Sequence, residues 1–228
     1  MKPYYQDKWV TILCGDSREI LPTFNVGDYF PHMTGSKVDL VLTDPPYGIN
    51  ACHMQLGSGL HKFQRGQWDD ARPVDLIRKV IGMNTKTVIW GGNYYTDILP
   101  MNNDWLVWHK LNDGLSFSEC ELAWSNLGRN TRVFSKYVAN IPKLHPTQKP
   151  DDVFMWCIEL AGDFIEVILD PFLGSGTACC CAKRLNRKSI GIEIEEKYCE
   201  IAAQRCMQEV MVDPRIAEGL DRQLGLLE

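Results

Sequence analysis

The sequence lacks three features that would place it in other protein classes. It has nine cysteines but no C-x-x-C pair, so the ligand spacing of a zinc site is missing. No run approaches the roughly 18 apolar residues of a membrane-spanning helix. Its N-terminus, MKPYYQDKWV, lacks the apolar core of a signal peptide. We therefore expect a cytoplasmic protein that binds no metal and crosses no membrane, with reduced, mostly buried cysteines.

The chain also lacks an overall positive charge, since its net charge is −5. The acidity lies at one end: residues 193–228 hold nine acids and four bases, and the remaining residues hold 20 of each. One strip, residues 126–144, carries four cations and no acid. They are Arg129, Arg132, Lys136 and Lys143. Alone, such a strip usually marks only a solvated face.

Short apolar runs that alternate with helical patterns predict an α/β fold. The runs cover residues 10–13, 38–43, 87–90, 105–108, 121–124, 167–169 and 189–192, and helical periodicity covers 73–84, 151–162, 177–186 and about 194–210. Continuous runs between helices indicate a mostly parallel sheet with both faces covered. No helix separates 105–108 from 121–124, so these runs predict an antiparallel hairpin at one edge. We expect one domain, residues 1–228, with a doubly wound, Rossmann-like sheet of seven strands.

A glycine loop follows one of the predicted buried strands. Residues 167–177 read VILDPFLGSGT, in which Gly174 and Gly176 open a helix. Glycines there allow close approach of a ligand to the backbone. Glu193 ends the next strand, 17 residues after Gly176, where an acid can bind a ribose hydroxyl pair. Because Cys179 stands where a dinucleotide fingerprint has its third glycine, a nucleoside cofactor without a pyrophosphate fits better than NAD.

A second motif, LTDPPYGI, occupies residues 42–49 at the end of another predicted strand. It places an acid, two prolines and an aromatic ring side by side. In isolation it reads equally well as an ordinary β-turn. Only 54 residues follow Gly174, so the rest of the sheet must come from the residues before it. The half with the cofactor loop is therefore last in the chain, and the half with DPPY is first.

With HPTQKP at residues 145–150 and GIEIEEKYCEIA from residue 191, these motifs resemble those of the DNA amino-methyltransferases that depend on S-adenosylmethionine. The permuted order resembles the β group of that family, which consists mostly of adenine-N6 enzymes. The resemblance implies a set of cofactor-binding residues. They are Asp16, His145, Thr147, Gln148, Lys149, Asp170, Phe172, Gly174, Gly176 and Glu193.

The same resemblance makes Asp44, Pro45, Pro46 and Tyr47 the catalytic motif. An exocyclic amino group is a poor nucleophile because its lone pair is delocalised into the base. Asp44 and the carbonyl of Pro45 can each accept one N–H, which localises that lone pair. The two prolines hold the carbonyl in place, and the ring of Tyr47 can stack on an extruded base.

The resemblance also implies double-stranded DNA as partner. The basic strip, 126–144, lies where the family carries its target-recognition region, and its four cations are candidate DNA contacts. So are His61, Lys62 and Arg65 in the stretch 50–70, which we interpret as a mobile active-site loop. A recognition insert this short suggests either a very short target site or help from a second subunit, as in a homodimer.

The sequence therefore predicts an adenine-N6 DNA methyltransferase of the kind found in restriction-modification systems. Asp44 favours adenine, since cytosine-N4 enzymes of the family often carry serine there. The alternatives are cytosine-N4 methylation, RNA or protein-amide methylation, a catalytically silent DNA-binding module and a nicotinamide-dependent oxidoreductase. Carbon-5 cytosine methylation is set aside because none of the nine cysteines follows a proline.

Overall fold

The computed structural model describes residues 1–32, 37–49, 71–112, 118–137 and 149–208. Its strands are β1 (Tyr5–Gln6), β2 (Val10–Cys14), β3 (Leu40–Thr43), β4 (Lys86–Trp90), β5 (Trp105–His109), β6 (Cys120–Ser125), β7 (Arg132–Ser135), β8 (Val167–Asp170) and β9 (Lys188–Glu193). Its α-helices are α1 (Ser17–Ile20), α2 (Val74–Gly82), α3 (Asp151–Ala161), α4 (Thr177–Arg184) and α5 (Glu196–Gln208). Short 3-10 turns are η1 (Leu21–Thr23), η2 (Val26–Asp28) and η4 (Gly92–Tyr94).

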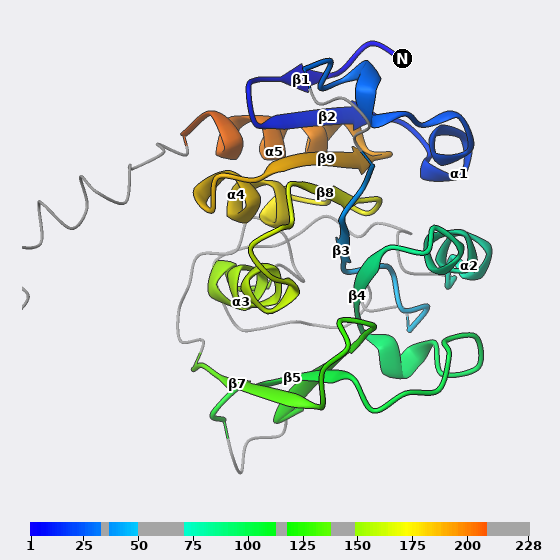
Figure 1. Cartoon of the computed structure of the whole chain (residues 1–228), viewed down its shortest axis with the longest axis vertical. Helices are drawn as coiled ribbons and strands as arrows, with labels where there is room; N and C mark the ends of the chain where they lie inside the picture. Colours follow the sequence, from blue (N-terminus) through cyan, green and yellow to red (C-terminus); the bar gives the residue numbers. More distant parts are fainter. Residues whose placement is uncertain (33–36, 50–70, 113–117, 138–148, 209–228) are drawn as a thin grey trace, which may run out of the picture.

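The described strands form one sheet in the order β1-β2-β9-β8-β3-β4-β6-β5-β7 (Figure 1). The five central strands, from β2 to β4, run parallel. The outer strands introduce the antiparallel pairs, β1 with β2, β4 with β6 and β6 with β5. The predicted α/β class and mostly parallel sheet are thus confirmed, and all seven predicted strands are present.

The sheet has nine strands rather than seven, because the predicted set omits β1 and β7. β1 is two residues long. β7 lies inside the basic strip, and none of its four residues is buried. The sequence therefore contains no apolar run that would predict this strand. The hairpin of β5 and β6 is antiparallel as predicted. It is not the edge of the sheet, however, since β7 pairs in parallel with β5 outside it.

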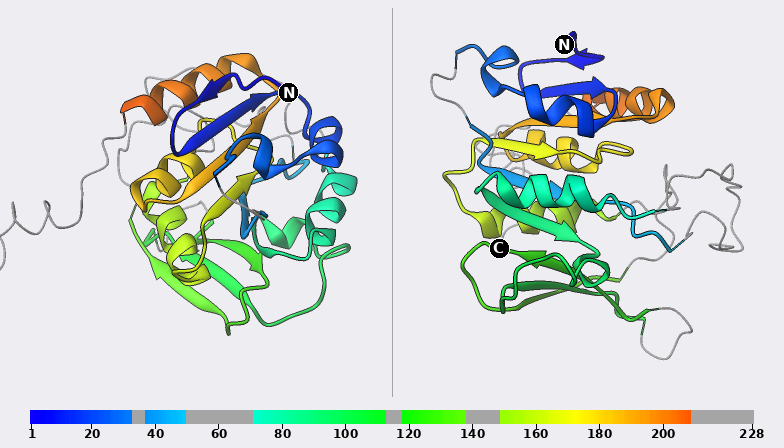
Figure 2. Two further views of the ribbon diagram at one scale, coloured as in Figure 1. Left: turned by 45° about the horizontal axis from the view of Figure 1, so that its top comes forward. Right: turned by 90° about the vertical axis from the view of Figure 1, so that its right-hand side faces the viewer.

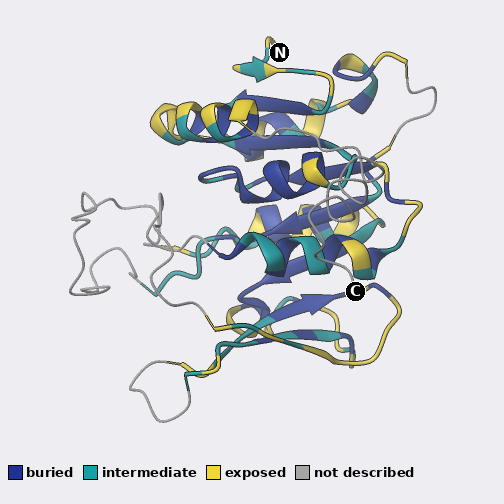
Figure 3. Cartoon of the chain, turned by 90° about the vertical axis from the view of Figure 1, so that its left-hand side faces the viewer, coloured by how far each residue is buried: buried dark blue, intermediate teal, exposed yellow. Residues whose placement is uncertain are grey.

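Helices cover both faces of the parallel part of the sheet, as two further views show (Figure 2). Alternation along β3 explains this: Leu40 and Leu42 pack in one cluster with α3 and α4, whereas Val41 packs in another with Val80 of α2. The helices α3, α4 and α5 lie on the first face, and α1 and α2 lie on the second. The strands between them are buried, whereas the helices carry exposed residues on their outer sides (Figure 3).

Cysteines contribute to this core as small apolar residues. Six of the eight described cysteines are buried, and no disulfide joins any of the eight. Three of them, Cys179, Cys180 and Cys181, are consecutive in α4, where they pack against the sheet and neighbouring helices. Within the described residues no group of acids, histidines and cysteines could hold a metal ion.

The connections between strands create a crevice at the centre of the sheet. The chain leaves β3 for α2 on one face and leaves β8 for α4 on the other, and β3 and β8 are neighbours. In open α/β sheets, ligands bind at such a switch point, beyond the carboxyl ends of the strands. Both sequence motifs, LTDPPYGI and LDPFLGSGT, begin at this edge.

Candidate active site

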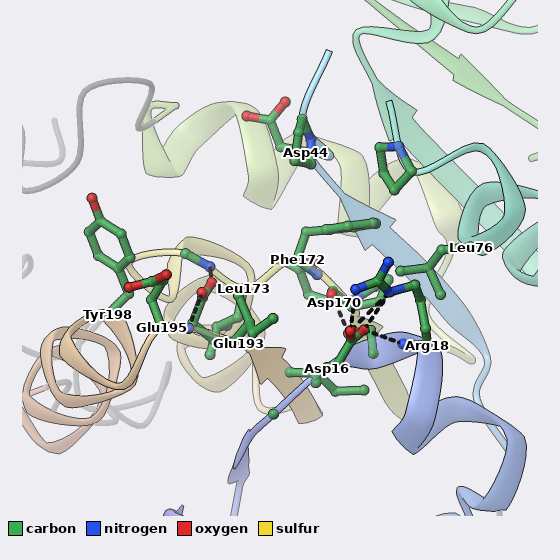
Figure 4. A pocket seen from close by; sticks show the side chains of 18 of the residues that line it. Asp16, Arg18, Asp44, Leu76, Asp170, Phe172, Leu173, Glu193, Glu195 and Tyr198 are labelled. Carbon is green, nitrogen blue, oxygen red and sulfur yellow. Dashed lines mark hydrogen bonds and ion pairs between the residues drawn. The ribbon is translucent and has the colours of Figure 1, made fainter. Parts of the chain in front are cut away.

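A cavity of about 740 Å³ opens at the carboxyl edge of the parallel strands (Figure 4). Four carboxylates that follow or end these strands line it. They are Asp16 after β2, Asp44 after β3, Asp170 at the end of β8 and Glu193 at the end of β9. The volume is within the range of small-molecule sites. The structure therefore brings the predicted cofactor loop and the predicted catalytic acid together in one cavity.

The glycine loop between β8 and α4 uses its two glycines differently. Both have positive φ, +53° at Gly174 and +87° at Gly176, which other residues rarely adopt. A Cβ at Gly174 would stand in open space, and this residue lines the cavity. A Cβ at Gly176 would lie 2.8 Å from the Cβ of Ala202 in α5. Gly174 thus leaves room for a ligand, whereas Gly176 allows α5 to pack closely.

Glu193 is tied to this loop by hydrogen bonds to its carboxylate. It accepts one from the Gly174 amide at 2.8 Å and one from the Glu195 amide at 2.9 Å (Figure 4). Burial raises the pKa of Glu193, and the amide donors oppose the shift. The carboxylate is therefore held at a defined place on the cavity wall, as an acceptor for hydroxyl groups.

Asp16 occupies the opposite flank of the cofactor loop, at the N-terminus of α1. Its carboxylate accepts from the backbone amide of Arg18 at 2.8 Å and pairs with the guanidinium of the same residue. These hydrogen bonds lower the pKa of Asp16. The acid is thus ionised, and it caps the short helix while facing the cavity.

Asp170, the last residue of β8, connects the two motifs by hydrogen bonds. Its Oδ1 accepts from the hydroxyl of Thr43, the last residue of β3, at 2.7 Å, and from the amide of Phe172 at 3.0 Å. Burial raises the pKa of Asp170 to about 7, although the Thr43 hydroxyl partly opposes the shift. Asp170 therefore fixes the turn that presents Phe172 to the cavity.

The charges around the cavity suit a cationic nucleoside. Among the described residues six acids and four bases line it, so the wall carries an excess of negative charge. A sulfonium group is a fixed positive charge and is favoured by such a wall. The open space at Gly174, the acceptor at Glu193 and the ring of Phe172 fit the remaining parts of S-adenosylmethionine.

The DPPY motif is held by the tyrosines around it. The hydroxyl of Tyr47 donates to Asp44, and its ring stacks on Tyr94 with the centroids 4.8 Å apart. The hydroxyl of Tyr95 donates to the carbonyl of Pro46. Gly91, after β4, has a φ of +67°, and a Cβ there would overlap the Tyr47 ring. The turn is therefore positioned before any substrate arrives.

Lys149 contacts the DPPY motif. The family resemblance makes it a cofactor-binding residue, yet its ammonium lies 2.6 Å from Asp44 Oδ2 and 3.0 Å from the Tyr47 hydroxyl. Its side chain is only 4% exposed. Burial alone would lower the pKa of Lys149, but the surrounding acids and Tyr47 hold it well above its ordinary value. Lys149 also lines the cavity, so its contact with Asp44 is compatible with the predicted contact to the cofactor.

Two charged residues that the sequence did not single out join this cluster from the β5–β6 hairpin. Glu121 Oε2 lies 3.2 Å from the Lys149 ammonium, and Lys110 lies 2.8 Å from Glu121 Oε1. Burial would raise the pKa of Glu121, but the two lysines lower it to about 2. In the sequence, Lys110 and Glu121 look like the ordinary surface charges of an edge hairpin. No motif or spacing there marks them as site residues.

Two of the cations predicted to contact DNA, Lys136 and Arg129, bond to opposite ends of α3. Lys136 pairs with Asp152 in the first turn of the helix, which begins two residues after Lys149. Arg129 donates to the carbonyl of Leu160 at 2.9 Å, in the last turn. Arg132 is exposed on β7 and lines a second hollow together with Arg129. A helix of this length separates its ends by about 15 Å. Arg129 is therefore remote from Asp44.

Several predicted site residues lie outside the described residues. These are His61, Lys62 and Arg65 in the stretch 50–70, and Lys143, His145, Thr147 and Gln148 in the stretch 138–148. The predicted insert, 126–144, is described only as far as residue 137. In the described part of the chain no helix is long and apolar enough to span a membrane.

Comparison with known proteins agrees with this site. The family model described as DNA methylase, of the N6/N4 type, matches residues 100–204. The type II methyltransferase M2.DpnII of Streptococcus pneumoniae is 32% identical, over 91% of this chain and 93% of its own length. The chain therefore belongs to the family of DNA amino-methyltransferases that use S-adenosylmethionine.

Solved structures show the same fold. The M1.HpyAVI complex with S-adenosylmethionine has a TM-score of 0.58 and 24% identity, over 86% of this chain and 98% of its own. PvuII DNA methyltransferase, which is cytosine-N4-specific, has a TM-score of 0.59 and 17% identity, over 98% and 95%. Both support the Rossmann-like architecture, and the cofactor is S-adenosylmethionine.

Proposed function

We propose that this DNA methyltransferase modifies the N6 amino group of adenine in double-stranded DNA. The observation that carries the proposal is the carboxylate of Asp44, first residue of DPPY, on the wall of the cofactor cavity. A carboxylate at this place accepts an amino N–H more strongly than the hydroxyl of a serine, the residue that cytosine-N4 enzymes often carry there. The M2.DpnII relative supports DNA as the substrate, whereas the PvuII neighbour makes cytosine-N4 the competing assignment.

The chain activates the amino group by placing two acceptors around it. Asp44 accepts one N–H and the carbonyl of Pro45 accepts the other, which turns the nitrogen lone pair toward the cavity. The bound cofactor supplies an electrophilic methyl group there. Tyr95 holds the Pro46 carbonyl, so the turn keeps its shape when the base enters. This is positioning together with preorganised electrostatics.

The target base must leave the duplex to reach this site. Asp44 is only 21% exposed and sits beside the buried Lys149, so a base stacked inside a helix cannot approach it. The paired rings of Tyr47 and Tyr94 offer a stacking surface at the same place. Stacking of an extruded base on an aromatic ring contributes about 1–3 kcal/mol.

The test uses radiolabelled S-adenosylmethionine with duplex DNA, RNA and protein, followed by mass spectrometry of the nucleosides. Label in DNA as N6-methyladenine is expected. N4-methylcytosine would correct the base, and label only in RNA or protein would overturn the proposal. Asp44→Ala should abolish transfer while cofactor binding persists. If cofactor binding were lost with it, the roles of the two motifs would be wrongly assigned.

A further inference from the structure

Four alternating charges form a chain from the edge hairpin to the catalytic motif. They are Lys110 directly after β5, Glu121 on β6, Lys149 before α3 and Asp44 after β3. The neighbouring pairs are 2.8, 3.2 and 2.6 Å apart, in that order. The four formal charges cancel, so this set is neutral as a whole although its centre is buried.

Lys149 is the centre of this arrangement. Its ammonium has three hydrogens, and three acceptors surround it: Asp44 at 2.6 Å, Glu121 at 3.2 Å and the Tyr47 hydroxyl at 3.0 Å. The ring of Trp90 lies beneath it, 5.4 Å from the ammonium to the centroid. A buried ammonium needs such compensation, since an unpaired charge in the interior is costly.

Asp44 has two tasks, because it is a partner of Lys149 and, in the proposed function, also the acceptor for the substrate amino group. An ammonium bound to one carboxylate alone draws that carboxylate's charge toward itself and away from an incoming N–H. Glu121 supplies a second carboxylate on another side of the ammonium, from a different strand. Lys149 therefore remains compensated when Asp44 turns to the amino group.

We propose that Glu121 is a positioning residue for methyl transfer, which acts through Lys149 to keep the Asp44 carboxylate available to the target amino group. Lys110 holds the far oxygen of Glu121 and keeps that carboxylate ionised and directed at Lys149. This role rests on the proposed function of Asp44 and goes beyond it. Neither the cofactor loop nor the DPPY motif contains Glu121.

The proposal predicts the direction of two pH shifts. The charged groups around Asp44 are Tyr47 on its own turn, Lys149, Glu121 on β6 and Asp170 on β8. Burial raises the pKa of Asp44, Lys149 and Tyr47 lower it, and Glu121 raises it again. The acid limb of the pH profile of kcat should therefore move to lower pH in Glu121→Gln and to higher pH in Lys149→Met.

The experiment measures kcat, its pH profile and cofactor affinity in Glu121→Gln, Lys149→Met and the control Glu119→Gln. Glu119 is exposed, lies two residues before Glu121 and loses the same charge. In Glu121→Gln we expect kcat to fall by about tenfold, with cofactor affinity unchanged and the acid limb displaced downward. Glu119→Gln should behave as the wild type. If Glu121→Gln does not fold, Glu121→Asp, which withdraws the carboxylate from Lys149, should lower kcat in the same way.

Failure of this inference is distinguishable from failure of the proposed function. If Asp44→Ala is inactive but Glu121→Gln matches Glu119→Gln in kcat and pH profile, Glu121 has no positioning role and the function of Asp44 stands. If Asp44→Ala remains active, the proposed function itself is wrong. An acid limb that moves in the same direction in Glu121→Gln and Lys149→Met would also overturn the proposal.

Discussion

The hydroxyl of Thr43 donates a 2.7 Å hydrogen bond to Asp170, although 127 residues separate them in the chain. Thr43 is the last residue of β3, directly before the catalytic motif, and Asp170 is the last residue of β8, directly before the cofactor loop. Both are buried. This bond thus joins the turn proposed to bind the substrate amino group to the turn proposed to bind the cofactor.

Removing the hydroxyl should destabilise the centre of the sheet. Thr43→Val leaves the buried Asp170 without this donor, which we expect to lower the free energy of unfolding by about 1–3 kcal/mol. Urea denaturation measures the change. Thr11→Val is a matched control, because Thr11 is equally buried in β2 and its hydroxyl has no partner among the described residues. Equal losses in both variants would contradict the importance of the bond.

Asp170 should make stability depend on pH. Burial raises its pKa to about 7, against about 3.9 in an unfolded chain. Between about pH 4 and 7 the folded protein therefore keeps a proton that the unfolded chain releases, and this contribution to stability is lost as the pH rises. In Asp170→Asn the contribution is absent.

Urea denaturation of both proteins at several pH values measures this effect. The stability of the wild type relative to Asp170→Asn should fall as the pH rises from 4 to 7. Asp163→Asn, at an exposed position, controls for removal of an aspartate. Parallel curves for the wild type and Asp170→Asn would show that Asp170 is ionised across this range.

Substitution by alanine should lower mainly cofactor affinity at Gly174 and mainly stability at Gly176. Gly174→Ala places a methyl group in the open space of the cavity, so cofactor affinity should fall at least about tenfold with a stability loss of only about 1–2 kcal/mol from the left-handed backbone. Gly176→Ala places it against Ala202 and should cost more, because α5 must move. Calorimetry with S-adenosylmethionine and thermal unfolding separate the two effects. Full affinity in Gly174→Ala would move the cofactor away from this loop.

Salt dependence of DNA binding should distinguish the two ends of α3. Lys136→Ala removes a cation at the N-terminal end of α3, the end that follows the cavity residue Lys149, so the slope of log affinity against log salt should decrease by about 1. Arg129→Ala should leave the slope unchanged, because Arg129 lies beside Leu160 at the far end of the helix, remote from Asp44. Titration of fluorescent duplex DNA at several salt concentrations measures both. A reduced slope in Arg129→Ala would instead place DNA at the far end of α3, beside the hollow that Arg129 and Arg132 line.

The sequence predicted the elements whose pattern is dictated by burial. The strands before Asp44 and Asp170 are continuous apolar runs, and parallel strands end at one edge, so the meeting of the two motifs followed from the pattern alone. β7 was missed because its side chains are exposed, and exposed strands carry no apolar signal.

The charge cluster around Lys149 could not be predicted in the same way. Lys149 belongs to a motif that the family resemblance associates with the cofactor, and Glu121 lies on a hairpin with no motif at all. Their contact depends on how far β6 extends beyond β4: Trp90, the end of β4, pairs with Ala123, so Glu121 lies beyond it. Register of this kind is a property of the folded sheet and has no local sequence signature.

The sheet order also sets the sequence of events during synthesis. β2 is the first strand of the parallel sheet to emerge from the ribosome, yet its parallel partner, β9, emerges after every other described strand. The nascent chain therefore carries one side of β2 and one side of β3 as unpaired apolar edges until residues 167–193 are made. Edges of this kind invite pairing with other chains. Truncation of the last 60 or so residues would consequently yield an aggregating chain rather than a smaller DNA-binding protein.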